Sequence, residues 1–245
     1  MLTGVILLKD NLAVNADRFS KDFSANSDAE MNEVVKDGST LILNIEGATV
    51  AISSMAQPVA QAEIEAAAKR AYKWPTALKA TQGHKGHLVV VVSEKEPDAL
   101  KHYTILTEVL ASLLRTTNAV AVYMPGQSML IEKTDYLNEA DELGTEYLPL
   151  NLWLYFGIEE GAEGNSGYTN GMKDFNKAEL EIINSKAGLD GVRAFLFNIA
   201  HYIIENDAAF ENGDTCGVTD DEEVAVEVVA GRFVKGTVCK LLYRP

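Results

Sequence analysis

The chain has 245 residues, of which 47% are hydrophobic and 23% are charged. These values exclude a disordered or fibrous protein and are typical of a soluble globular protein. Asp and Glu number 36 against 21 Lys and Arg, which gives a formal net charge of -15. A surface of this charge repels phosphate backbones and anionic lipids, so we expect neither nucleic acid nor membrane as a partner.

The N-terminal sequence MLTGVILLKDN predicts a first strand rather than a signal peptide, because no basic residue precedes its apolar run and no cleavage pattern follows it. No apolar stretch approaches the roughly 20 residues that a membrane helix needs. The two cysteines, Cys216 and Cys239, make neither a disulfide framework nor a zinc site and fit a reducing compartment. We therefore expect a cytoplasmic protein.

Hydrophobic periodicity predicts strands and helices in alternation over the first part of the chain. Pro58 is favourable in the first turn of a helix, and Trp74-Pro75 would end that helix. The valine run at 88–92 is apolar enough for a strand that is covered on both faces. The predicted elements are a strand at 5–8, a helix at 13–23, a polar connection at 24–34, strands at 41–45 and 50–53, a helix at 58–74 and a strand at 88–92.

The second part of the chain repeats this order after a longer amphipathic helix at 97–114, which we expect to join two halves. The glycine-rich segment GIEEGAEGNSG could be read as a phosphate-binding loop, but its glutamates would repel a phosphate. We therefore predict a long hairpin connection. The predicted elements are strands at 119–123, 152–156 and 168–172, helices at 132–143, 178–183 and 192–205, and a final hairpin at 224–229 and 237–243.

Two stretches of the sequence resemble each other at corresponding places in this order. GATVAISSMAQPVAQAEIE starts at Gly47 and GYTNGMKDFNKAELE starts at Gly167, and each predicts a hairpin that leads into an acidic helix. We therefore predict an α+β protein with two ferredoxin-like (βαββαβ) units in tandem, formed by antiparallel sheets with helices mainly on one face. The predicted boundaries are 1–96 for the first unit, 97–117 for the connecting helix and 118–245 for the second unit with its C-terminal hairpin.

Several motifs together resemble a known family. They are SSMAQPVAQAEIE, AYKWP and GHKGHLVVVV in the first part, and LPLNLWLYFG and GYTNGMKDFNKAELEI in the second. The chain is similar over residues 4–206 to the bacterial family catalogued as domain of unknown function 4261. The resemblance implies no established activity and no catalytic residues, and it suggests a likeness to small acidic proteins of bacterial toxin and immunity loci.

Few residues suggest a chemical site. His84 and His87 form the only close histidine pair, but zinc needs at least one further ligand, so they are more simply polar residues at a strand entry. We predict no cofactor and no metal. The acids form clearer clusters, and most acidic runs only keep a protein soluble. We nevertheless predict a binding surface at Glu139, Asp141, Glu142, Glu159, Glu160 and Glu163. The acidic run at 214–223 is the control group, whose neutralisation should affect binding less.

The sequence therefore favours a non-catalytic binding protein whose acidic surface meets a basic protein partner, with neutralisation of a toxin as one such role. The alternative is a small-molecule hydrolase or other enzyme with its site in a cleft between the two units. A concave pocket that brings His84, His87 and carboxylates together, or a bound metal, would favour the enzyme. The oligomeric state is left open.

Overall fold

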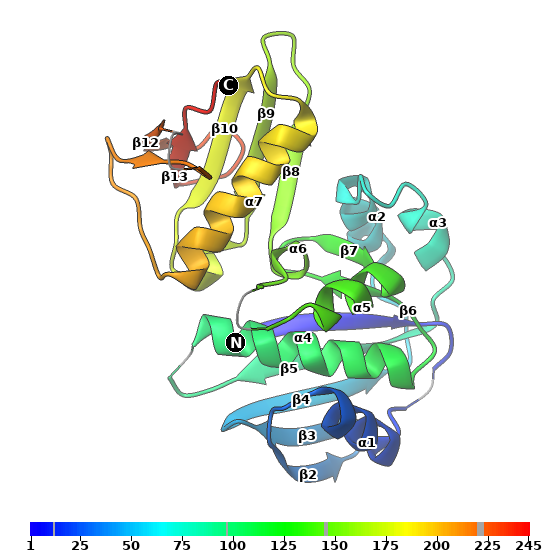
Figure 1. Cartoon of the computed structure of the whole chain (residues 1–245). Helices are drawn as coiled ribbons and strands as arrows, with labels where there is room; N and C mark the ends of the chain where they lie inside the picture. The colour runs from blue at the N-terminus through cyan, green and yellow to red at the C-terminus, as the bar shows by residue number, and fades with distance from the viewer. Residues whose placement is uncertain (12, 97, 145–146, 220–222) are drawn as a thin grey trace. The chain divides into compact units, whose positions relative to one another are not determined.

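Figure 1 shows the computed structural model of the chain, which describes residues 1–11, 13–96, 98–144, 147–219 and 223–245. The chain divides into two compact units, unit 1 at Met1–Leu152 and unit 2 at Trp153–Pro245. This division differs from the predicted one, in which residues 97–117 join two halves. The reason is that strand β6 (Ala119–Met124) pairs with the first strand, β1 (Leu2–Leu8), so the predicted linker helix lies inside unit 1.

Unit 1 contains a seven-stranded sheet in the order β2-β3-β4-β5-β1-β6-β7, and its strand pairs are antiparallel. Its helices include α4, which begins after Asp98, whose side chain accepts a hydrogen bond from the Lys101 amide and caps the helix. The remaining elements of unit 1 are α1 (Ala16–Asn26), β2 (Met31–Asp37), β3 (Thr40–Ile45), β4 (Ala48–Met55), α2 (Gln61–Arg70), α3 (Ala77–Thr81), β5 (Gly86–Ser93), α4 (Ala99–Thr116), β7 (Met129–Glu132), α5 (Lys133–Asp141) and α6 (Leu150–Trp153), which ends one residue into unit 2.

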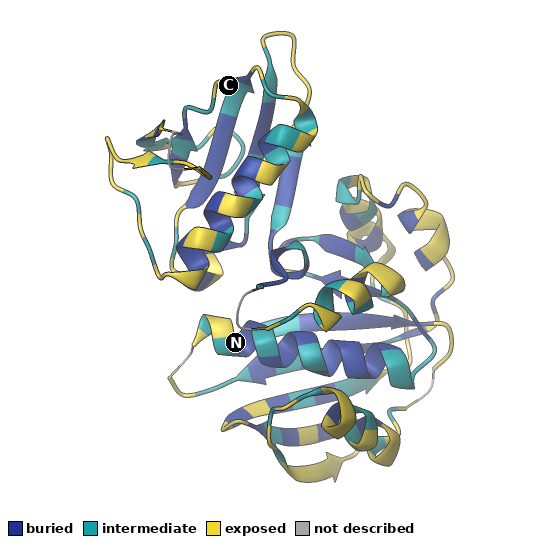
Figure 2. Cartoon of the chain, viewed as in Figure 1, coloured by how far each residue is buried: buried dark blue, intermediate teal, exposed yellow. Residues whose placement is uncertain are grey.

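Helices lie against both faces of the first sheet. On one face α4 packs on β1, where Gly4 leaves room for Leu106 and Leu110, and α1 and α5 flank α4. On the other face α2 and α3 cover an apolar cluster that includes Val5, Leu7 and Trp74. Figure 2 shows the buried residues on the inner sides of these helices and along the strands. The prediction of helices mainly on one face is therefore wrong for this sheet.

The valine strand β5 alternates between buried and half-buried residues instead of being covered equally on both faces. Leu88, Val90 and Val92 face the α4 side and are fully buried, whereas α2 and α3 leave the other side of β5 partly open. Among the described residues, no helix combines the length and the apolar character needed to cross a lipid bilayer.

Unit 2 contains a six-stranded sheet in the order β11-β12-β13-β10-β9-β8. The pair β10–β13 is parallel and the other pairs are antiparallel, so the sheet is mixed. One long helix, α7, contacts β8, β9 and β10. The elements are β8 (Tyr155–Glu159), β9 (Asn165–Asn170), the 3-10 helix η1 (Met172–Phe175), β10 (Glu179–Ser185), α7 (Leu189–Glu205), β11 (Thr215–Cys216), β12 (Val224–Ala230) and β13 (Thr237–Leu241).

The α+β class is confirmed, but the tandem ferredoxin-like units are not. A ferredoxin-like unit is a split βαβ arrangement in which the first and third strands lie side by side in parallel. In unit 1 the neighbours of β1 are β5 and β6, and both run antiparallel to it. In unit 2 no helix separates the first two strands, β8 and β9, which form a hairpin.

Three local predictions also differ from the structure. A helix is expected at 178–183, but residues 179–183 belong to β10. Residues 152–153 of the expected strand belong to α6, so β8 starts only at Tyr155. The polar connection at 24–34 contains the start of β2, an exposed edge strand. The expected start of the long helix at residue 97 lies outside the described residues.

Candidate functional site

The histidines His84, which precedes β5, and His87, which is the second residue of β5, both make hydrogen bonds inside the fold. The Nε2 atom of His84 accepts a hydrogen bond of 2.9 Å from the Val59 amide, and its Nδ1 lies 2.9 Å from the carbonyl oxygen of Thr81, to which it must donate. His87 Nδ1 donates in the same way to the carbonyl of Gln57 at 2.7 Å. Both ring nitrogens of His84 are therefore occupied, and this buried side chain joins the chain before α2 to the end of α3.

Within the part of the chain that the structure describes, no group of three or more His, Cys, Asp and Glu side chains is placed to hold a metal ion. We expect purified protein to contain no stoichiometric zinc, nickel or iron, because a metal at His84 would have to displace one of its two hydrogen bonds. Elemental analysis checks this, and about one metal per chain that disappears in the His84→Ala variant would contradict it.

The first group of predicted acids lies in unit 1, and two of its three side chains, Glu139 and Asp141, already bind other residues of the fold. Glu139 accepts hydrogen bonds from the Tyr147 hydroxyl at 2.9 Å and from the Asn151 side-chain amide at 2.7 Å, which connect α5 to α6 and to the segment before it. Burial raises the pKa of Tyr147 above its ordinary value, and the hydrogen bond to Glu139 adds to this increase. Glu139 is therefore a structural residue, and Glu142, at the end of α5, is exposed.

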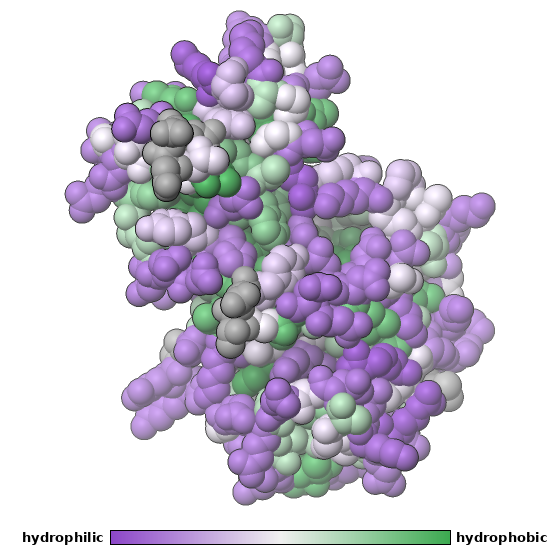
Figure 3. Space-filling model, viewed as in Figure 1, coloured by the Kyte–Doolittle hydropathy of each residue, from purple (hydrophilic) through white to green (hydrophobic). Residues whose placement is uncertain are grey.

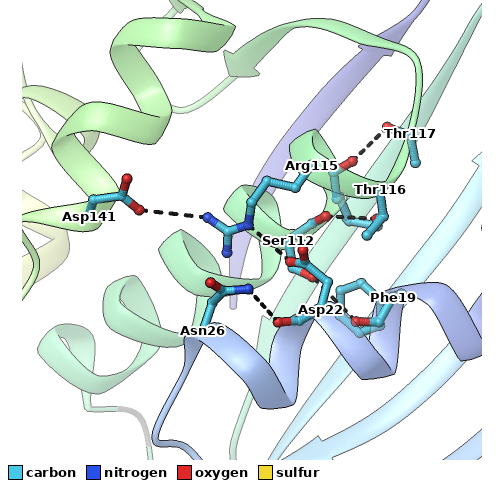
Figure 4. Close-up of polar contacts among 9 residues, drawn as sticks. Phe19, Asp22, Asn26, Ser112, Arg115, Thr116, Thr117 and Asp141 are labelled. Carbon is cyan, nitrogen blue, oxygen red and sulfur yellow. Dashed lines mark hydrogen bonds and ion pairs between the residues drawn. The ribbon is translucent and has the colours of Figure 1, made fainter.

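Asp141 belongs to an ion-pair bridge between helices, which Figure 4 shows. The guanidinium of Arg115, near the end of α4, lies 3.0 Å from Asp22 of α1 and 3.7 Å from Asp141 of α5. One cation thus links the two helices that flank α4. Because 72% of the Asp141 side chain is exposed, we expect its bond to Arg115 to contribute little to stability.

The second group of predicted acids lies in unit 2, on the β8–β9 hairpin. The Glu163 carboxylate accepts a hydrogen bond of 2.7 Å from the side chain of Asn184, and its backbone carbonyl accepts one from Lys186. The side chains of Glu159 and Glu160 are exposed, and their carboxylates make no hydrogen bond or ion pair with any described residue. The six predicted acids do not flank one strand, as the sequence suggested, because residues 152–153 are helical and the two groups belong to different units.

The third acidic run includes residues 220–222, which lie outside the described residues. On the face of the molecule that Figure 3 shows, hydrophilic residues predominate.

Two buried carboxylates of β10 were missed by the sequence analysis. Glu181 is only 1% exposed and accepts hydrogen bonds of 2.8 to 3.1 Å from three successive amides, at Arg232, Phe233 and Val234. Glu179 accepts from the Thr169 hydroxyl and from the Gly171 amide. The Glu181 carboxylate therefore holds the turn between β12 and β13 against the sheet, because three aligned N–H groups form a concave site for an anion.

Aromatic rings pack against the same turn. The rings of Tyr168 and Phe233 stack with centroids 5.0 Å apart, the guanidinium of Arg232 lies 5.4 Å from the Phe233 centroid, and Tyr155 meets Tyr168 edge to face at 5.9 Å. Tyr168 also covers Gly157, where an added Cβ would lie 2.3 Å from the ring. A continuous stack of Gly157, Tyr168, Phe233 and Arg232 results.

Unit 1 has an open cavity of about 320 Å³ beside the start of α1. Apolar residues such as Val14, Leu41 and Ile52 line it together with Lys36 and several hydroxyl groups. Among the described residues that line it there is no histidine, cysteine or carboxylate.

The Glu108 side chain of α4 is partly buried, and its Oε2 atom has no hydrogen-bond partner in the described structure. Burial raises the pKa of Glu108 above its ordinary value. A hydrogen bond from Ser27 opposes this increase, and the nearby carboxylates of Asp28 and Glu46 add to it. Because the pKa is higher in the folded state, the folded protein loses stability as pH rises from the unfolded-state value, about 4.3, through the folded-state value.

Glu108→Gln is therefore expected to raise the free energy of unfolding at neutral pH by about 1 kcal/mol, because it removes an unsatisfied charge. The gain should shrink on acidification and vanish below about pH 4, where both states of the wild type bind the proton. Urea denaturation across this pH range measures it. Glu96→Gln, at an exposed position, is the control, and an equal gain in both variants would show that general charge reduction is responsible.

The fold and these surfaces define an acidic α+β protein with a mixed sheet in unit 2 and acids exposed on a hairpin. Residues 168–242 match the family described as Domain of unknown function (DUF4261), which confirms the resemblance to that family. The match covers most of unit 2, including Tyr168, Glu179, Glu181 and the turn at 231–236, whereas the motifs of the first part of the sequence lie outside it. Comparisons with curated proteins and with solved structures gave no match.

Proposed function

We propose that the chain is a non-catalytic binding protein that recognises a basic protein partner through exposed carboxylates of unit 2. The observation that carries this proposal is the state of the Glu159 and Glu160 side chains, whose carboxylates are exposed and make no hydrogen bond or ion pair with a described residue. Three of the other predicted acids, Glu139, Asp141 and Glu163, already have partners within the fold. Neutralisation of a basic toxin is one form of this function.

Two further observations support the proposal. The net charge of -15 attracts a basic partner over a distance and raises the rate of encounter more than the final affinity. Cys239 is a buried thiol, which agrees with the cytoplasmic location that we propose.

The test is to identify the partner by affinity capture from the native host and then to measure association rates at several salt concentrations. Neutralising both exposed acids with Glu159→Gln and Glu160→Gln should slow association by about threefold and flatten its dependence on salt, because screened attraction acts on the encounter. The matched control combines Asp190→Asn and Glu211→Gln, which remove two exposed charges elsewhere in unit 2.

Equal slowing by the two double variants would reduce the effect to net charge alone. An association rate that does not depend on salt would remove the electrostatic proposal.

A further inference from the structure

The sheet side of the cavity in unit 1 is a row of side chains that the strand register fixes. Lys36 of β2 lies opposite Leu41 of β3, and Leu41 lies opposite Ile52 of β4. Residues directly opposite each other in an antiparallel pair share one face of the sheet, so these three side chains are neighbours. Ser54 lies two residues after Ile52 and therefore on the same face.

The segment that leads into α1 lines the cavity from the helix side. Ala13, Val14 and Ala16 contribute from this segment, and Gly38 and Ser39 contribute from the turn between β2 and β3. Most of these residues have small side chains, which leave the space beside the sheet unfilled. The volume of about 320 Å³ is at the small end of the range for ligand pockets in proteins, about 300–1,000 Å³, so the cavity suits a small ligand.

The polar side chains of the lining include donors that have no partner. The ammonium of Lys36 and the hydroxyls of Ser39 and Ser54 make no hydrogen bond or ion pair with a described residue. The neighbouring Asp37 lies opposite Thr40, on the other face of the sheet. The chain contains 36 acids, yet the described lining of this cavity has one cation and no carboxylate. The lining therefore suits an anionic group.

The remainder of the lining suits an apolar body. Leu41 and Ile52 are buried, and Val14 is half-buried. A ligand that covers these side chains removes apolar surface from water, which favours binding. A single lysine matches a single negative charge, and the net charge of -15 opposes the approach of a more highly charged ligand. A monocarboxylate therefore fits better than a phosphate dianion.

We propose that the cavity beside α1 binds a small monocarboxylate whose charged end pairs with Lys36 and whose apolar body lies against Leu41 and Ile52. The hydroxyls of Ser39 and Ser54 supply further donors to the charged end. This inference concerns unit 1 and does not depend on the function proposed for the carboxylates of unit 2.

The test is a titration of the full chain, labelled in its methyl groups, with hexanoate, hexanol and hexylamine under nuclear magnetic resonance. Hexanoate should shift the methyl resonances of Leu41 and Ile52 in a saturable way and bind at least about threefold more tightly than hexylamine. Lys36→Gln should weaken hexanoate by about threefold and leave hexanol unchanged, because it removes only the charge. The matched control is Lys79→Gln, which changes an exposed lysine of α3 outside the lining.

A steric variant tests the cavity separately from its charge. Ala16→Leu places a larger side chain in the cavity and keeps Lys36, and leucine is favourable in a helix, so hexanoate binding should be lost while the rest of the methyl spectrum is preserved. Unchanged affinity in this variant, or hexanoate binding without shifts at Leu41 and Ile52, would overturn the cavity as the site. Equal affinities for hexanoate and hexylamine, or equal effects of Lys36→Gln and Lys79→Gln, would overturn the preference for an anion.

Discussion

Glu181→Ala is expected to lower the free energy of unfolding by about 3 kcal/mol, because it leaves three amide donors at the β12–β13 turn without their acceptor. The carboxylate is 1% exposed, so water cannot easily replace it without a change in structure. The turn should then detach from the sheet, and Phe233 should leave Tyr168. Urea denaturation measures the loss, and near-ultraviolet circular dichroism reports the change around the rings.

The control for this change is Glu227→Ala. Glu227 lies on β12 and forms an ion pair of 2.9 Å with Lys240, but 43% of its side chain is exposed, so its loss should change stability by less than about 1 kcal/mol. Glu181→Gln keeps one acceptor oxygen and should fall between the two. If Glu181→Ala and Glu227→Ala cost the same, the buried carboxylate does not organise the turn.

The sequence predicted many individual elements because their apolar residues repeat with a clear period. The helices α1, α4 and α7 and the hairpin β3–β4 follow this rule. Two similar motifs, Ala-Glu-Ile-Glu at 62–65 and Ala-Glu-Leu-Glu at 178–181, were both predicted to be helical, and the prediction is right for the first and wrong for the second. The first lies in α2 and is followed by alanines, which favour a helix, whereas the second lies in β10 and is followed by Ile182 and Ile183, which favour a strand.

The topology could not be derived from the order of elements alone. Strand β2 was missed because it is an edge strand with mostly exposed, polar residues, which carry no hydrophobic alternation. The neighbours of β1 are set by long-range pairing with β5 and β6, on which local sequence gives no information. The order of strands and helices resembles that of the ferredoxin-like fold, but this order alone does not determine which strands are neighbours in the sheet.

The partners of the acidic side chains in the candidate site could not be predicted from local sequence either. Composition revealed that Glu139 and Glu159 both lie in acidic runs. It could not reveal that Glu139 meets Tyr147 and Asn151 whereas Glu159 is exposed, because those contacts depend on how α5 meets a later segment. The pattern Glu-Leu-Glu at 179–181 did hold a signal, since alternation in a strand places both glutamates on one face.

Gly157→Ala is expected to lower the free energy of unfolding by about 1–3 kcal/mol, the usual effect of forcing an extra methyl group into a packed site. The new Cβ would lie 2.3 Å from two ring carbons of Tyr168, closer than any stable contact. Gly157 is not among the glycines with positive φ, so alanine suits its backbone and the expected loss comes from the ring alone. Urea denaturation measures the loss, and the tyrosine resonances should shift as Tyr168 moves.

Two comparisons separate this steric effect from a general effect of alanine. Gly191 lies in α7, and a Cβ added there would meet only Ala187, at 3.4 Å. The higher helix propensity of alanine should therefore make Gly191→Ala more stable by up to about 1 kcal/mol. In a Tyr168→Ala background the clash is absent, and Gly157→Ala should then cost little, which gives a coupling between the two positions. If Gly157→Ala costs the same with and without the tyrosine ring, the ring does not press on the strand. Tyr168 would then be free to move, and the ring would not be held between Gly157 and Phe233.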